Sequence, residues 1–392
     1  MNRSDRMQAA AQGYIDRAQF SGIEWYVEAS GKTLTQGKVG LADSTKGVEI
    51  PDGALYRIYS MTKPLVSVMA LILIEQGKLR LYDMLPQFNP AFANMRVLLP
   101  DGQLQPAMRP IMVEDLMTHR AGFTYEFITG CHIAPGYDAI DLSSDGQCSL
   151  DEMMTKLASQ PLAFQPGTQY RYSVSTDVLA HVLEKATGRT MASLLKEYIL
   201  EPLDMQDTDY HVPDEKQNRL LPMFGVEDIA ELSALNPPKE QILNISDAEE
   251  MYPSNDPTYS RGGHGLFSTL ADYSKFARML FNGKTPSGVP IISRKMLDMM
   301  TTNRIPAAQL PLKIGLNPLP GYGWGLGVRI MMDTGQSLAL TGKGEFGWAG
   351  AASTYFWVDP TEQMFGVIMT QYLGSMLPMS DDLRTAAYQM LE

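Results

Sequence analysis

Residues 55–64 read Leu55-Tyr-Arg-Ile-Tyr59-Ser60-Met61-Thr62-Lys63-Pro64, and the chain continues Leu65-Val-Ser-Val-Met-Ala-Leu-Ile-Leu-Ile74. Residues 55–59 alternate and are rich in aromatic and β-branched side chains, which predicts a short strand. The apolar run after them ends at Glu75-Gln-Gly77-Lys78 and predicts a helix, and Pro64 fits only its first turn. We therefore expect Ser60 where a strand meets a helix N-terminus, with Lys63 one turn further on the same face.

This placement gives Ser60 useful chemistry. A helix N-terminus offers free backbone N–H groups and a partial positive charge, which stabilise an alkoxide or a bound oxyanion. Lys63 can take or relay the hydroxyl proton, and Ser-x-x-Lys is the signature of penicillin-binding proteins and β-lactamases. The plain alternative is that Ser60 only caps the helix. A second copy of the spacing, Ser193-Leu-Leu-Lys196, lies in an amphipathic pattern with no strand before it and is interpreted as an ordinary helix face.

Size and composition narrow the class of protein. The 392 residues can form one large or two ordinary domains, and a hydrophobic content of 44% is enough for a full core. The formal net charge is −12 and the basic residues are scattered, which argues against nucleic acid or an anionic membrane as a partner. We expect a small-molecule ester as the partner, and the sequence leaves a homo-oligomer open.

Localisation and cofactors follow from the same features. The N-terminal residues contain no apolar segment of the signal-peptide kind, and the apolar run at residues 66–74 is too short to span a bilayer. We therefore expect a cytoplasmic protein, in which Cys131 and Cys148 are thiols rather than a disulfide. The five histidines are dispersed and no Cys/His cluster has zinc spacing, so no metal ion or other cofactor is expected.

The rest of the chain predicts two kinds of structure. Alternation at residues 23–29 and 33–41 predicts a β-hairpin, and strands return at residues 323–331, 338–342, 351–358 and 363–372. Between these regions, short helices at residues 113–118, 150–159, 176–187 and 191–199 are separated by long loops of the kind that form active-site rims. We expect an α/β (α+β) domain of residues 1–80 and 267–392, a helical, loop-rich domain of residues 81–266 inserted in it, and an active site between the two.

Four separated motifs resemble those of one family. They are Ser60-Met-Thr-Lys63, Asp115-Leu-Met-Thr-His119-Arg-Ala-Gly122, Pro166-Gly-Thr-Gln-Tyr-Arg-Tyr172-Ser173-Val174 and Phe346-Gly-Trp348-Ala349-Gly350-Ala351. In this order the sequence resembles the class C β-lactamase-like serine hydrolases, and most closely the β-lactamase-like carboxylesterases called family VIII esterases. The resemblance implies the β-lactamase/DD-peptidase-like fold, an antiparallel sheet flanked by helices beside a mostly helical domain.

The resemblance also implies roles for individual residues. Ser60 matches the nucleophile, Lys63 its lysine partner, and Tyr172 the tyrosine of the third motif quoted above. By the same matching, the backbone N–H groups of Ser60 and Ala351 form an oxyanion hole. Candidate substrate-binding residues at or near the motifs are Trp348, Gly350, Tyr125 and Val174.

Two departures from the β-lactamase pattern bear on the substrate. Val174 stands where the lactamases carry Asn, and Trp348 stands where they carry Lys, so two hydrogen-bonding groups and one cation are missing. A charge-assisted contact is worth about 1.5–3 kcal/mol, so losing one lowers the preference for an anionic substrate by roughly tenfold to a hundredfold. What remains is an apolar, aromatic edge, which favours neutral esters with short or small hydrophobic acyl groups.

The expected chemistry is ester hydrolysis in two steps through an acyl-Ser60 intermediate. The general base is left open. Either Tyr172 acts as a tyrosinate beside a cationic Lys63, which we favour, or a desolvated Lys63 takes the proton itself. Spacing alone does not exclude two rival tyrosines, and two histidines are interpreted as structural because no Gly-x-Ser-x-Gly elbow accompanies them. These four residues are Tyr59, Tyr170, His119 and His264.

Four functions can be built on these residues. The first expectation is a serine carboxylesterase. A β-lactamase or D-Ala-D-Ala peptidase is disfavoured by Val174 and Trp348, and by the expected cytoplasmic location, because peptidoglycan lies outside the cytosol. Acyl transfer to a specific alcohol or amine is the third function, and an inactive binding or sensor module is the fourth. The intact set of Ser60, Lys63 and Tyr172 argues against the last.

Overall fold

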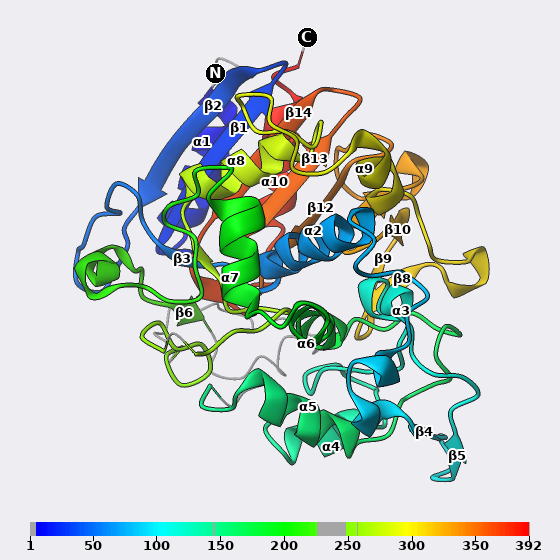
Figure 1. Ribbon diagram of the computed structural model, residues 1–392. Coiled ribbons are helices and arrows are strands. Elements are labelled where there is room, and N and C mark those ends of the chain that lie inside the picture. Colours follow the sequence, from blue (N-terminus) through cyan, green and yellow to red (C-terminus); the bar gives the residue numbers. More distant parts are fainter. Residues whose placement is uncertain (1–4, 144–145, 226–247, 257, 392) are drawn as a thin grey trace.

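The largest sheet of the described residues has seven antiparallel strands in the order β10-β11-β12-β13-β14-β1-β2, and it lies in the upper part of the view in Figure 1. The computed structural model describes residues 5–143, 146–225, 248–256 and 258–391. Strands from both ends of the sequence meet where β1 pairs with β14, with Trp25 opposite Ile368. The strands are β1 Gly22–Ala29, β2 Lys32–Gly40, β10 Tyr322–Trp324, β11 Arg329–Met331, β12 Phe346–Ala349, β13 Tyr355–Asp359 and β14 Met364–Met369.

The predicted β1–β2 hairpin is confirmed. Ser30 and Gly31 connect the two strands, and both have positive φ angles, 50° and 74°. Two consecutive left-handed residues are the hallmark of a tight hairpin turn whose twist matches that of the strands. This hairpin forms one edge of the sheet.

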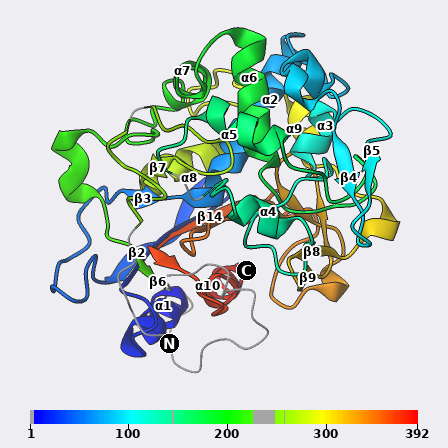
Figure 2. The ribbon, with the colours of Figure 1, turned by 90° about the horizontal axis from the view of Figure 1, so that it is seen from below.

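Helices cover both faces of the sheet, as the view in Figure 2 shows. On one face α1 (Arg6–Asp16) and α10 (Met379–Tyr388) pack against each other over a cluster that includes Trp25 and Trp357. On the other face α8 (Leu270–Met279) lies against β1, β13 and β14. On the same face α2 (Thr62–Glu75) lies close to the bend between β10 and β11, and every residue from Thr62 to Leu73 is buried. A helix that is apolar on all sides needs such surroundings.

The helices around α2 belong mainly to the middle of the chain. The helices predicted at residues 113–118, 150–159, 176–187 and 191–199 are present as α3, α5, α6 and α7. The remaining short strands form separate two-stranded pairs, of which β3–β7 and β6–β15 are buried. These elements are α3 Val113–Met117, α4 Ala134–Asp138, α5 Leu150–Ala158, α6 Ser175–Thr187, α7 Met191–Leu195 with the π-helical turn Lys196–Leu200, α9 Arg294–Met300, β3 Tyr56–Arg57, β4 Arg96–Leu98, β5 Leu104–Pro106, β6 Phe224–Gly225, β7 Phe267–Ser268, β8 Leu312–Ile314, β9 Asn317–Leu319 and β15 Tyr372–Leu373.

The C-terminal strands differ from the prediction in three places. Residues 323–331 form two strands, β10 and β11, because the chain turns at Gly325 and Gly327. A Cβ at Gly327 would lie 2.0 Å from the Ser67 hydroxyl of α2, so the bend is pressed against that helix. No strand forms at residues 338–342. The strand predicted at residues 351–358 begins later, because β12 occupies Phe346–Ala349, a turn follows, and β13 runs from Tyr355 to Asp359.

The sheet and its covering helices use residues from both ends of the chain, and α3 to α7 come from between them. The domain boundaries at residues 80 and 267 stay a prediction. Within the described ranges, none of the helices is both long enough and apolar enough to cross a bilayer. Cys131 and Cys148 are both buried and are not joined by a disulfide.

Candidate active site

Ser60 lies where the sequence predicts it, between a short strand and a buried helix. β3 pairs with β7, one turn of 3₁₀ helix follows at Tyr59–Met61, and α2 begins at Thr62. Tyr59 has a φ of 43°, a left-handed conformation that is strained for a side chain of this size. Its ring packs on Tyr252 with centroids 4.8 Å apart, which helps to hold the turn. Ser60 itself remains partly exposed.

Lys63 occupies the second position of α2 and is 1% exposed. Its Nζ lies 3.1 Å from Ser60 Oγ, 2.8 Å from the Tyr125 hydroxyl and 2.7 Å from the Gly263 carbonyl oxygen. An ammonium group has three N–H donors and no acceptor, so these three oxygens match its full donor set. The lysine is thus fixed by contacts from three separate parts of the chain.

Tyr172 completes the cluster from the loop before α6. Its hydroxyl donates to Ser60 Oγ at 2.7 Å, and Trp348 Nε1 of β12 donates to the Tyr172 hydroxyl at 3.1 Å. Lys63 Nζ lies 4.8 Å from the centroid of the Tyr172 ring. The structure therefore brings Ser60, Lys63 and Tyr172 together, although Ser60 and Tyr172 are 112 residues apart in the sequence.

The rival residues lie elsewhere or have other partners. The hydroxyls of Tyr59 and Tyr170 are buried and have no hydrogen-bond partner in the described part of the chain. Burial raises the pKa of Tyr59 to about 12 and that of Tyr170 well above the ordinary value. His119 Nδ1 lies 3.3 Å from Ser173 Oγ, and His264 Nε2 lies 2.7 Å from the Tyr259 hydroxyl. Burial is the main reason why the pKa values of both imidazoles lie well below the usual range. The positive charge of Lys63 lowers the pKa of His119 further, and that of Arg261 lowers the pKa of His264.

The turn after β12 lies against the chain that carries Ser60. A Cβ on Gly350 would meet Thr354 Oγ1 at 2.2 Å and the Ile58 carbonyl oxygen at 2.5 Å, so only glycine allows this approach. Ala351 follows it and packs beside the apolar cluster that contains Tyr59. Outside helices and strands, no backbone carbonyl of the described residues accepts a hydrogen bond from the N–H of Ser60 or Ala351. The oxyanion hole that they are predicted to form stays a prediction.

Two candidate substrate-binding residues have different surroundings from those expected. Val174 is fully buried at the N-terminus of α6, and its N–H donates to the Thr124 carbonyl at 3.2 Å. Its position gives no support to a substrate contact. Tyr125 is 4% exposed, and its hydroxyl is engaged by Lys63. Burial, and then the charge of Asp177, raise the pKa of Tyr125 well above its ordinary value, so it is a neutral phenol.

Sequence reasoning missed the part played by Gly263. Its carbonyl oxygen accepts from Lys63, and its N–H donates to Asp177 Oδ1 at 2.8 Å. The glycine run at residues 262–265 was visible in the sequence, but it lacks phosphate-binding spacing. The sequence signal is the pair of adjacent glycines, which is typical of places where the backbone approaches another element closely. A Cβ on Gly262 would lie 1.9 Å from the Thr176 carbonyl oxygen of α6.

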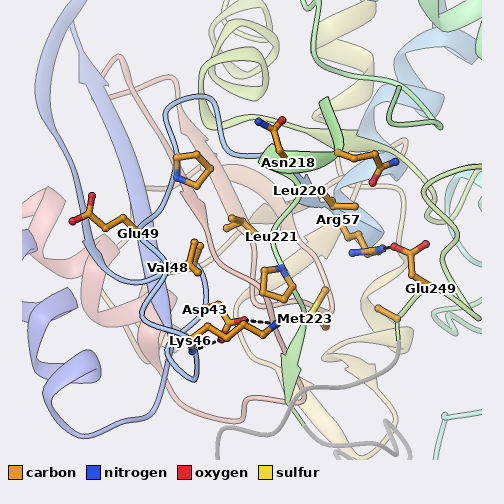
Figure 3. A pocket seen from close by; sticks show the side chains of 15 residues that line it. Asp43, Lys46, Val48, Glu49, Arg57, Asn218, Leu220, Leu221, Met223 and Glu249 are labelled. Atoms are coloured by element: carbon orange, nitrogen blue, oxygen red, sulfur yellow. Dashed lines mark hydrogen bonds and ion pairs between the residues drawn. The ribbon is translucent and has the colours of Figure 1, made fainter. Parts of the chain in front are cut away.

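A separate cavity of about 470 Å³ lies between residues 42–51 and 217–223 (Figure 3). Arg57 and Leu221 are among its lining residues, whereas Ser60, Lys63 and Tyr172 are not among the described residues that line it. Charges of both signs, from Asp43, Lys46 and Glu49, face or border it. The cavity therefore indicates no single ligand class and is distinct from the cluster around Ser60.

The chain belongs to the Beta-lactamase family, whose model matches residues 7–390. This confirms the resemblance drawn from the four motifs. The sequence is 29% identical to Protein Rv1367c of Mycobacterium tuberculosis, over 94% of this chain and 90% of that protein. It is 26% identical to Esterase EstB of Burkholderia gladioli, over 98% of this chain and 94% of that protein.

Solved structures confirm the fold. The structure of EstCE1, described as a hydrolase with promiscuous acyltransferase activity, superposes with a TM-score of 0.82 at 22% identity and covers 98% of both chains. The predicted β-lactamase/DD-peptidase-like fold, an antiparallel sheet with flanking helices, is therefore correct.

Proposed function

We propose that the protein is a serine carboxylesterase that hydrolyses short-chain or small hydrophobic carboxylic esters through an acyl-Ser60 intermediate. The observation that carries the proposal is the contact of the partly exposed Ser60 Oγ with the Tyr172 hydroxyl at 2.7 Å and with Lys63 Nζ at 3.1 Å. These distances are within hydrogen-bond reach for proton transfer. Membership of a hydrolase family, with an esterase among the relatives, supports it.

Tyr172 first loses its phenolic proton to solvent; Ser60 Oγ then attacks the ester carbonyl carbon while the Ser60 proton passes to the Tyr172 phenolate. The carbon–oxygen double bond opens to an oxyanion, which rests against the backbone N–H groups of Ser60 and Ala351. Collapse of this intermediate expels the alcohol, which takes the proton from Tyr172. Water then attacks the acyl-enzyme, loses a proton to Tyr172 and releases the acid, and Ser60 regains its proton.

The contacts of Lys63 suit an ammonium group, and a cationic Lys63 leaves Tyr172 as the base. The Gly263 carbonyl oxygen can only accept a hydrogen bond, and it takes one from Lys63 at 2.7 Å. An ammonium group donates to all three neighbours of Nζ, and its positive charge beside the Tyr172 ring stabilises a phenolate. Trp348, a donor only, adds a hydrogen bond that strengthens when the Tyr172 oxygen is charged.

A neutral ester suits the site better than a β-lactam or peptide carboxylate. The position that carries Lys in the lactamases is Trp348, which is 4% exposed and offers its single N–H to Tyr172. At this position tryptophan therefore supplies no cation that could bind a carboxylate. We therefore propose that the substrate is an ester with an uncharged acyl group. We expect the β-lactam nitrocefin to be hydrolysed much more slowly than such an ester.

The predicted domain division fits this arrangement. Ser60, Lys63 and Trp348 come from residues 1–80 and 267–392, and Tyr172 comes from residues 81–266. We propose that the active site lies between these two parts. The cytoplasmic location expected from the sequence stays a prediction.

The proposal is tested with p-nitrophenyl esters of increasing acyl length and with intact-mass spectrometry after brief exposure to each ester. We expect turnover and a mass increase equal to one acyl group, both abolished in Ser60→Ala. A serine-directed fluorophosphonate should label the wild-type protein and not the variant. Undiminished turnover in Ser60→Ala would refute the mechanism, and absent labelling of the wild type would favour a non-enzymatic binding module. Ester products formed in the presence of added alcohols would instead indicate acyl transfer.

A further inference from the structure

Asp177 is a fully buried carboxylate behind the cluster around Ser60. It lies in the first turn of α6, five residues after Tyr172, and none of its surface is exposed. Its Oδ1 accepts the Gly263 N–H at 2.8 Å, and the carbonyl oxygen of the same glycine accepts from Lys63 Nζ at 2.7 Å. One residue of the backbone thus connects this carboxylate to the lysine that contacts Ser60.

The packing at Gly263 shows how closely these groups converge. A Cβ built there would lie 2.4 Å from Asp177 Oδ2 and 2.7 Å from the Tyr125 hydroxyl. The missing side chain is therefore what allows the carboxylate and the phenol to approach the same point. Tyr125 in turn contacts Lys63 at 2.8 Å. Lys63 thus contacts two groups, the Gly263 carbonyl and the Tyr125 hydroxyl, that both lie close to Asp177.

The second oxygen of Asp177 has an unusual environment. Within the described residues Oδ2 has no hydrogen-bond partner, although it is buried. A buried anion without a donor is costly unless a nearby cation compensates it. The charged and titratable groups that face Asp177 from the elements around it are Lys63 of α2, Tyr125, Tyr210 and Arg261. Of these, Lys63 and Arg261 are cations.

The pKa of Asp177 reflects two opposing influences. Burial raises the pKa of Asp177, while Lys63, the Gly263 N–H and Arg261 act in the opposite direction. The charge of Asp177 contributes in turn to the raised pKa of Tyr125. A neutral Lys63 could accept a hydrogen bond from the Tyr125 O–H, whereas an ammonium donates to it. A nearby anion favours the ammonium form.

We infer that Asp177 is a positioning residue that fixes Gly263 and keeps Lys63 protonated, so that Tyr172 takes the Ser60 proton. This inference rests on the proposed function, because it assigns the base in that reaction. The plain structural alternative is that Asp177 only balances the dipole of α6 at its first turn. The two accounts differ in the pH dependence of turnover, since only the first couples Asp177 to the reacting groups.

The test is Asp177→Asn, which preserves size and an acceptor for the Gly263 N–H but removes the charge. We expect kcat/KM to fall at least about tenfold and both limbs of its pH profile to move to lower pH by about one unit, because removing an anion eases proton loss from its neighbours. The matched control is Asp272→Asn, another buried carboxylate in the first turn of a helix, α8, bonded to the Asp207 N–H at 2.7 Å. Its pH profile should not move. Unshifted limbs in a folded Asp177→Asn protein would overturn the inference.

A measurement on the wild-type protein covers the case in which Asp177→Asn does not fold. In protein labelled with ¹³C at lysine Cε, the Lys63 signal is assigned by its absence in Lys63→Arg. We expect the chemical shift of an ammonium at the pH of maximal turnover, and the shift of a free amine there would overturn the inference. Failure of the proposed function gives a different result, because Ser60 then takes up no acyl group in the wild type.

Discussion

Trp348→Phe is the substitution that most directly probes the Tyr172 oxygen. The indole N–H donates to that oxygen at 3.1 Å, and phenylalanine keeps the aromatic ring but not the donor. If Tyr172 takes the Ser60 proton as a phenolate, the lost hydrogen bond is one to a charged group. Such a bond contributes about 1.5–3 kcal/mol, whereas a bond between neutral groups contributes about 0.5–1.5 kcal/mol.

These energies translate into measurable effects. Since about 1.36 kcal/mol corresponds to one decade, the phenolate mechanism predicts a fall in kcat/KM of about 10- to 150-fold. The acid limb of the kcat/KM profile should move to higher pH by about one to two units, because the ionised form has lost a donor. A neutral Tyr172 that only orients Ser60 would give a loss of at most about tenfold and no movement of the limb.

The assay is kcat/KM for p-nitrophenyl butyrate between pH 5 and 10, with thermal unfolding to check the fold. Trp324→Phe is the matched control, since this neighbouring tryptophan lies with its ring centroid 4.5 Å from that of Trp348 and donates its N–H to the Met117 carbonyl at 3.1 Å. It should lower the melting temperature without moving the acid limb. An acid limb that stays in place in folded Trp348→Phe contradicts a tyrosinate base.

Three further predictions concern the lysine, the turn after β12 and acid stability. Lys63→Arg keeps a positive charge but not the compact three-donor geometry, so kcat for the same ester should fall at least about 100-fold; near-normal turnover would show that charge alone suffices. Gly350→Ala forces a Cβ to within 2.5 Å of the Ile58 carbonyl oxygen, so both the acylation burst and the melting temperature should fall, and an unchanged burst would separate this turn from Ser60. The hydrogen bond from Arg219 lowers the pKa of Asp207 to about 2. The ionised Asp207 therefore contributes about 1 kcal/mol, after solvent screening, to the free energy of unfolding. This contribution is present above about pH 4 and is lost as the pH falls through about 2. Asp207→Asn should flatten that part of the stability profile in urea unfolding, and an unchanged profile would remove Asp207 from the acid transition.

Local sequence predicted the first half of the site well. A strand followed by an all-apolar helix places Ser60 and Lys63 one turn apart, and the structure has them so, because a three-residue spacing on a helix leaves little freedom. Tyr172 needed the motif, since Tyr170 lies in the same loop and no periodicity distinguishes the two. The 3₁₀ turn and the left-handed Tyr59 could not be predicted, because tertiary packing on Tyr252 stabilises them.

The contacts that need tertiary structure were the ones missed. Gly263 lies 200 residues from Lys63, and its contribution is a backbone carbonyl that any residue possesses. The single strand predicted at residues 323–331 was wrong because its bends depend on close approaches to α2 and α9, where a Cβ at Gly325 would lie 2.0 Å from the Met300 carbonyl oxygen. A run of apolar residues interrupted by glycines does not show where such an approach occurs.

The structure gives Trp348, which stands where the lactamases carry Lys, a further role. In the sequence, tryptophan at this position indicated only that a cation is missing and that the edge of the site is apolar. In the structure the side chain is buried and its N–H points at Tyr172, so it supplies a neutral donor to the proposed base. A lysine at that position would add a second positive charge beside Tyr172, next to that of Lys63. With tryptophan, Lys63 is the cation in contact with Ser60, and a buried carboxylate, Asp177, already faces it. An anionic substrate would therefore meet a cation that Asp177 partly neutralises, whereas an uncharged ester needs no cation. Tryptophan in place of lysine thus weakens the binding of carboxylates and still donates a hydrogen bond to Tyr172, the proposed base.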